Sequence, residues 1–87
     1  AIIDEVELAT TLVSRLNILA PDTIQARYGI EQLSEDNLDV LNQIGKVRGL
    51  MLKGGEVDLV RASLTLVGDF RSGKLGKISL DTVENRL

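Results

Sequence analysis

The chain has 87 residues, of which 44% are hydrophobic and 26% charged, and this composition is typical of one small globular domain. It contains no Cys and no His, which excludes disulfides and thiolate metal sites and removes the commonest general base. No apolar run reaches the roughly 20 residues of a membrane span, and the acidic start is unlike a signal peptide. Because the chain also opens without Met, we expect a cytoplasmic fragment of a longer protein with no contact to a membrane.

The net charge of −3 hides an uneven distribution of charge along the chain. Residues 1–45 carry eight acidic and two basic groups, whereas residues 46–77 carry seven basic and three acidic groups. A basic third in an otherwise acidic protein can place a cationic patch against a polyanion. The paired carboxylates of the acidic segment have no His beside them, so we interpret them as solvated surface with no catalytic or metal role.

The first half of the chain predicts two helices. Apolar residues recur at three- and four-residue spacing over residues 2–20, and Pro21 ends that helix. The stretch "TIQARY" follows as a short helix, capped by Asp22 and ended by Gly29. Tyr28, at the end of this helix, is expected to be a core or half-buried residue rather than a stacking platform for a base.

The second half predicts two more helices. Ser34 is expected to cap the third helix, which ends at Gly49. After a glycine turn, Asp58 caps a fourth helix that places Phe70 in the core and ends at Gly73.

The fold class expected from these elements is all-α. We predict a small bundle of three to four helices around an aliphatic core, with a short extended C-terminal segment in which Ile78 and Leu80 alternate around Ser79. The whole is expected to form a single helical domain over residues 1–82, followed by a tail over residues 83–87.

The stretch "GDFRSGKL" comes close to a nucleotide-binding P-loop. Gly68, Gly73 and Lys74 fit that pattern, but Leu75 stands where a Ser or Thr hydroxyl would bind magnesium. A helix precedes the glycines here, so the negative end of its dipole would face a phosphate. We therefore interpret the stretch as a helix C-terminus with Gly73 in the left-handed conformation, and expect no cofactor in this chain.

Three blocks in this order, "RYGI", "IGKVRGLMLKGGEVDLVRAS" and "DFRSGKLGKISLD", resemble the C-terminal helical domain of the YlqF/RbgA-type ribosome assembly GTPases. The resemblance runs from about Tyr28 to Asp81. It implies a parent protein with a circularly permuted GTPase domain, which binds the large ribosomal subunit late in its assembly. None of the GTPase motifs is present in these 87 residues. GTP and magnesium are therefore expected only in the missing domain, and this fragment is not expected to be an enzyme.

The resemblance also implies partners and a binding surface. The partners would be ribosomal RNA of the large subunit, ribosomal proteins and the GTPase domain of the same polypeptide. Cations would contact phosphates, and glycines would let the backbone approach them. The RNA-binding residues carried over are Lys46, Arg48, Lys53, Gly54, Gly55, Arg71, Lys74 and Lys77.

Other interpretations of the same residues stay open. Each glycine also suits a turn or a helix cap, and each cation suits a helix end. The alternative function is a protein docking module that packs on a GTPase domain without direct RNA contact. A third possibility, an autonomous nucleotide-binding enzyme, would require GTP or ATP binding by this fragment, which we do not expect.

Overall fold

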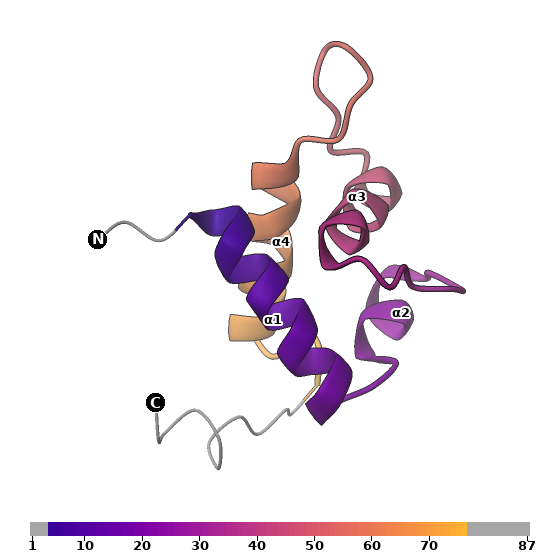
Figure 1. The fold of residues 1–87 in the computed structure, drawn as a ribbon, viewed down its shortest axis with the longest axis vertical. Coiled ribbons are helices and arrows are strands. Elements are labelled where there is room, and N and C mark those ends of the chain that lie inside the picture. The colour runs from indigo at the N-terminus through magenta and orange to yellow at the C-terminus, as the bar shows by residue number, and fades with distance from the viewer. Residues whose placement is uncertain (1–3, 77–87) are drawn as a thin grey trace.

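The computed structural model describes residues 4–76, which fold into four helices (Figure 1). They are α1 (Glu5–Leu19), α2 (Thr23–Tyr28), α3 (Asn37–Arg48) and α4 (Leu59–Arg71). The all-α prediction is confirmed. The predicted extended segment around Ser79 and the boundary at residue 82 lie outside the described residues. Within residues 4–76, no helix is both long enough and apolar enough to cross a membrane.

Helices α1, α3 and α4 pack against one another, and α2 packs against α1. The core is aliphatic except for one tyrosine, and it consists of Ala9, Leu12, Val13, Leu16, Ile24, Tyr28, Val40, Leu41, Ile44, Val57, Ala62, Leu66 and Leu75. Tyr28 is buried, as predicted. The prediction that Phe70 lies in the core was wrong. Its side chain packs on the core but is only partly buried, because it lies at the edge between α1 and α4.

Two of the expected helix caps differ from the prediction. Asp22 stands before α2, but its backbone is left-handed, with φ of 72°, and its side chain makes no capping hydrogen bond. Capping side chains normally require an extended backbone at this position, which Asp22 lacks. Ser34 does not cap α3; Asp36 does so, and its carboxylate accepts a hydrogen bond of 2.9 Å from the Leu38 amide. The Ser34 hydroxyl instead accepts from the Asp36 amide and forms the turn before the helix.

The start of the first helix also differs from the predicted residue 2: α1 begins at Glu5, and the Asp4 carboxylate caps it by accepting from the Val6 amide at 2.9 Å. The other helix ends follow the sequence closely. Gly29 and Gly49 close α2 and α3 with φ of 67° and 69°, a conformation that glycine adopts without steric cost. Asp58 caps α4 by accepting from the Arg61 amide. Helix α4 ends at Arg71, with Ser72 as its C-cap and Gly73 left-handed directly after it.

The connection between α3 and α4 is a protruding loop (Figure 1). An isolated antiparallel bridge between Met51 and Val57 closes its base. Val57 then turns inward and lies against Gly45, which is buried within α3. A Cβ atom on Gly45 would lie only 2.2 Å from Cγ1 of Val57, so the glycine allows the loop base to pack directly on the helix backbone.

Candidate nucleic-acid interface

The structure separates the predicted RNA-binding residues into three places. Lys46 and Arg48 lie in the last turn of α3. The segment 53–55 forms the turn of the protruding loop, where the Gly55 amide donates to the Leu52 carbonyl and Gly55 has φ of 87°. Arg71 and Lys74 lie at the end of α4. Lys77 lies outside the described residues.

The end of α4 explains the P-loop-like stretch. The Gly73 amide donates to the Phe70 carbonyl at 3.2 Å, and the Lys74 amide donates to the Asp69 carbonyl at 2.9 Å. These two bonds form the Schellman motif, which satisfies the last carbonyls of a helix through a left-handed glycine. The interpretation of "GDFRSGKL" as a helix C-terminus is confirmed.

A buried carboxylate organises this end of the molecule. Asp69 has only 12% of its side chain exposed, and its Oδ2 atom accepts a 2.7 Å hydrogen bond from the Tyr28 hydroxyl. The same oxygen accepts from Nε of Arg27 at 3.2 Å. Asp69 thereby joins the end of α4 to α2.

Two further cations lie at this end of the molecule, one on the ring of Tyr28 and one acting on the carboxylate itself. The Arg48 guanidinium sits over the Tyr28 ring, 5.0 Å from its centre, in a cation–π geometry. Lys74 follows Gly73 at the end of α4, and its charge acts on Asp69. We refer to Arg27, Tyr28, Arg48, Asp69 and Lys74 together as the Asp69 cluster.

The pKa values in the cluster reflect these contacts. Burial pushes the pKa of Asp69 upward, but the hydrogen bonds from Tyr28 and Arg27 and the positive charges of Arg27 and Lys74 outweigh it, so the pKa is lowered. Burial and the bond to Asp69 raise the pKa of Tyr28 above its ordinary value of 10.0, so the phenol is a protonated donor at neutral pH and well above it. The cluster therefore combines one carboxylate with two cations that act on it, Arg27 and Lys74, and a third cation, Arg48, on the ring of its hydrogen-bond donor Tyr28.

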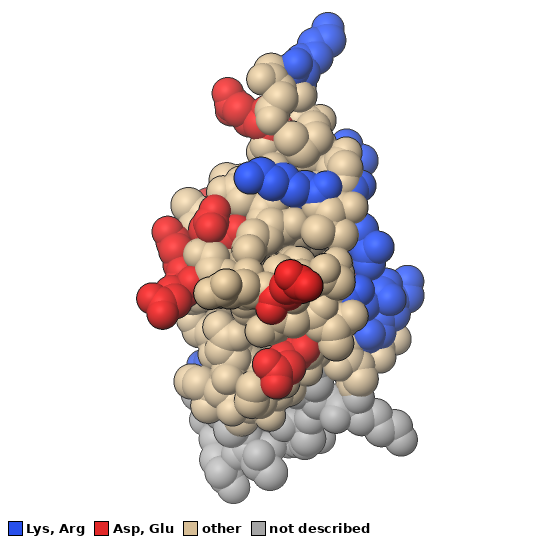
Figure 2. All heavy atoms as spheres, turned by 90° about the vertical axis from the view of Figure 1, so that its right-hand side faces the viewer, with Lys and Arg blue, Asp and Glu red and all other residues tan. Residues whose placement is uncertain are grey.

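Part of the cluster lines a surface hollow. Arg27 and Lys74 share its wall with Thr23, Ala26, Leu75 and Gly76. On the face shown in Figure 2, several Lys and Arg side chains gather along the right-hand edge, others lie at the top and across the upper middle, and Asp and Glu side chains occupy the left side and centre. The charges on this face are thus partly separated.

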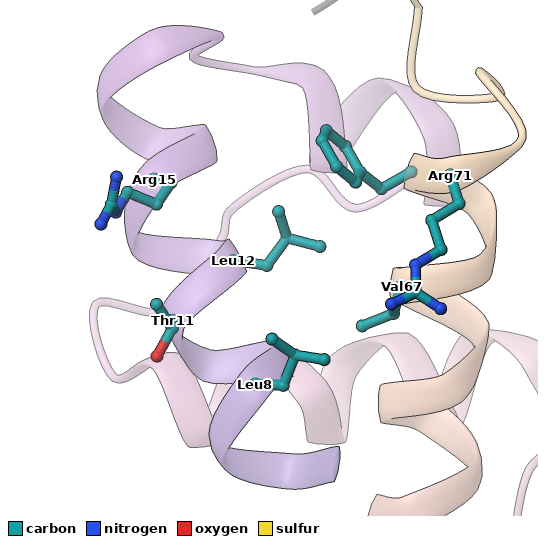
Figure 3. Close-up of a pocket in the computed structure, with 7 residues that line it drawn as sticks. Leu8, Thr11, Leu12, Arg15, Val67 and Arg71 are labelled. Atoms are coloured by element: carbon teal, nitrogen blue, oxygen red, sulfur yellow. The ribbon is translucent and has the colours of Figure 1, made fainter. Parts of the chain in front are cut away.

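Arg71 belongs to a different surface. It lines an apolar groove between α1 and α4, with Arg15 on the α1 side (Figure 3). Leu8 and Leu12 from α1 and Val67 from α4 point into this groove. Arg71 and Lys74, which the sequence assigned to one patch, line separate depressions of the surface.

Three residues of the cluster, Arg27, Tyr28 and Asp69, were absent from the predicted site, and Tyr28 was predicted only as a core or half-buried residue. Arg27 was one of the two basic groups counted in residues 1–45, and Asp69 one of the three acidic groups counted in residues 46–77. They lie 42 positions apart, so no local pattern connects them. The "RYGI" block was the one signal that pointed toward Arg27. Among residues 4–76, no three acidic side chains gather into a set that could hold a metal ion.

No protein-family model matches the chain. Among curated proteins, it is 34% identical over 64 residues to ribosome biogenesis GTPase A of Bacillus cereus, a match that covers 74% of this chain and 22% of that protein. It is 29% identical over 65 residues to ribosome biogenesis GTPase A of Bacillus licheniformis, covering 75% of this chain and 23% of that protein.

A third match is to an archaeal protein. The chain is 34% identical over 73 residues to the uncharacterized GTP-binding protein MJ1464 of Methanocaldococcus jannaschii, covering 84% of this chain and 19% of that protein. The chain is therefore related to the YlqF/RbgA-type ribosome biogenesis GTPases, and the matches are consistent with a C-terminal domain of these proteins. It spans about a fifth of the length of the curated relatives it matches. The resemblance seen in the three sequence blocks is confirmed, and it concerns one domain of these GTPases.

Proposed function

We propose that this chain is the RNA- and ribosome-binding domain of a ribosome assembly GTPase that acts in late maturation of the large subunit. The observation that carries the proposal is the Asp69 cluster, which brings three cations from α2, α3 and the end of α4 to one place. The curated relatives named as ribosome biogenesis GTPases supply the biological context. Hydrolysis of GTP, with its magnesium ion, belongs to the remainder of the parent protein, in the cytoplasm.

The surface suits phosphate contacts better than contacts to bases. Each phosphate neutralised by Lys or Arg releases counterions, so such binding is strong and depends on salt. Tyr28, the aromatic residue of the cluster, is buried with 3% exposure and is covered by Arg48, so it is not available for stacking on a base. The proposed mode is therefore recognition of the shape and backbone of structured RNA.

The loop residues extend this surface. Lys53 and the two glycines after it protrude on the loop between α3 and α4 and can reach a second part of the RNA (Figure 1). Lys46 in the last turn of α3 and Lys77 complete the proposed set of contacts.

The test is binding of the 87-residue chain to large ribosomal subunits over a salt series. If about four phosphates are engaged, log affinity falls against log salt with a slope of roughly −3. Reversal of Arg48 and Lys74 to Glu should weaken binding and flatten this slope. Reversal of Arg61, an exposed cation in the first turn of α4, changes the charge as much as the reversal of Arg48 or Lys74 alone. It serves as the control for each single reversal and should have a smaller effect. Binding that is absent or insensitive to salt would refute the proposal.

A second candidate function is favoured by the groove between α1 and α4. Its apolar wall, with Arg71 at its side, fits an apolar surface that carries a carboxylate. The occupant we assign is the GTP-binding domain of the parent protein, because about four fifths of each matched relative lies outside this domain. Changing Leu8 and Val67 to Gln should weaken binding to that domain supplied as a separate protein, while the Arg48 and Lys74 reversals should not. Equal binding of all these variants would exclude the groove.

A further inference from the structure

We infer that the Asp69 cluster is a preorganised binding site for backbone phosphates of structured RNA, and that Asp69 is its positioning residue although it carries the same charge as the ligand. This inference rests on the proposed function for the identity of the ligand. It adds Arg27 to the contacting residues, and it assigns to a carboxylate the role of holding two arginines in place.

Arg27 is held in a geometry that leaves most of its donors available. The contact to Asp69 uses Nε, and a guanidinium has four further N–H groups on its two terminal nitrogens. The Arg27 side chain is 32% exposed and lines the hollow together with Lys74. A guanidinium anchored through one edge can present its other edge to a phosphate in the bidentate manner typical of arginine.

Arg48 is held indirectly by the same carboxylate. Its guanidinium rests on the ring of Tyr28, and the hydroxyl of that ring donates to Asp69. Because the Tyr28 ring is buried, its neighbours hold it in place, and the exposed guanidinium of Arg48 lies on a fixed surface. Ordering a long side chain on binding costs conformational entropy, and a side chain that is already ordered avoids part of that cost.

Lys74 completes the site from the end of α4. Its amide donates to the Asp69 carbonyl, so its position follows from the helix-ending motif. The equivalent position after α3 is Leu50, which packs against the core. After α4 the same position holds the exposed Lys74, beside the hollow. Here the next residue, the buried Leu75, makes the apolar contact with the core.

The inference is testable because it predicts whether Asp69 strengthens or weakens RNA binding. A patch that worked by charge alone would bind RNA better without Asp69, because removing a carboxylate makes the surface more positive. A preorganised site would bind worse, because Arg27 and Tyr28 lose the charged acceptor that positions them. The two explanations therefore predict opposite effects for one substitution.

The experiment compares two variants that change the net charge equally. Asp69→Asn removes the buried carboxylate, and Glu56→Gln removes an exposed one from the protruding loop. Both are measured against large ribosomal subunits over the salt series, with circular dichroism to verify the fold. We expect Asp69→Asn to bind about threefold more weakly than the unmodified chain, and Glu56→Gln to bind equally or more tightly.

A second variant keeps the test decisive if Asp69→Asn does not fold. Tyr28→Phe retains the ring beneath Arg48 and removes only the hydroxyl that bonds to Asp69. A smaller loss of affinity, about twofold, is expected from it. Tighter or unchanged binding by Asp69→Asn, or by Tyr28→Phe where Asp69→Asn fails to fold, overturns the inference and leaves the proposed function intact. Absence of salt-dependent binding by the unmodified chain overturns the proposed function itself, and this inference with it.

Discussion

Replacing Gly45 with Ala tests how the loop between α3 and α4 is joined to the core. An ideal Cβ atom at this position lies 2.2 Å from Cγ1 of Val57 and 3.4 Å from its Cβ and Cγ2 atoms. Non-bonded carbons normally approach to about 3.5–4.0 Å, so Val57 would have to move by more than about 1 Å. Val57 cannot move freely, because it pairs with Met51 and directly precedes the N-cap of α4.

The expected change in the free energy of unfolding is the balance of two opposing contributions, overpacking and helix propensity. Overpacking a core typically costs about 1–3 kcal/mol, and the severity of this overlap places Gly45→Ala near the upper end. Alanine is favoured over glycine in a helix interior by about 1 kcal/mol, which offsets part of the cost. We expect a net loss of about 2 kcal/mol in the free energy of unfolding, equivalent to a decrease of roughly 10 °C in Tm for a domain of this size.

The assay is urea unfolding followed by circular dichroism, with Gly68→Ala as the matched control. Gly68 lies inside α4, and nothing is found within 4 Å of an added Cβ atom. The same substitution should therefore stabilise the protein there, by up to about 1 kcal/mol. In addition, Val57→Ala should lower the free energy of unfolding less in the Gly45→Ala variant than in the unmodified chain, because it removes the methyl groups that clash with Ala at position 45. Two glycine variants that respond alike would refute the packing argument.

Three further predictions concern the Asp69 cluster and the helix caps. Tyr28→Phe should lower the free energy of unfolding by about 1–3 kcal/mol in urea, since the buried carboxylate of Asp69 loses a donor; an unchanged midpoint would contradict the bond. The pKa of Asp69 is lowered on folding from its ordinary value of 3.8, so its contribution to stability is complete at neutral pH and is lost as the pH falls below that value. Thermal unfolding between about pH 2 and pH 6 should therefore show a steeper acid decline for the unmodified chain than for Asp69→Asn, and parallel curves would refute the assignment. Asp36→Ala should lower the free energy of unfolding by about 1 kcal/mol, and Ser34→Ala should lower it clearly less. The Tm values of the two variants measure this order, and the reverse order would identify Ser34 as the cap of α3.

The two proposals assign RNA binding and docking of the GTP-binding domain to different surfaces of this chain. Arg48 lies on the ring of Tyr28 and Lys74 acts on the buried Asp69, whereas Arg71 lies beside the groove between α1 and α4. If both proposals hold, the domain positions the GTPase on the large ribosomal subunit. The variants proposed for each surface measure the two contacts separately.

The sequence by itself determined the helices and most of their ends. Apolar periodicity and local cap residues decide these features, and both depend on neighbours within a few positions along the chain. Gly29, Gly49 and Asp58 act at the positions where the sequence placed them. Ser34 was misplaced because Asp36, two residues later, is an equally good cap by composition, and only the backbone conformation distinguishes the two.

The sequence also showed that the cations concentrate in one third of the chain, but it did not show which of them lie together. Arg27 and Asp69 meet only because α2 packs beside the end of α4, and Gly45 is required only because Val57 returns to α3 after the loop. Arg71 and Lys74 are three positions apart and line different depressions, because the helix ends between them and the chain changes direction at Gly73. Contacts between residues distant in sequence are decided by packing, and no local pattern records them.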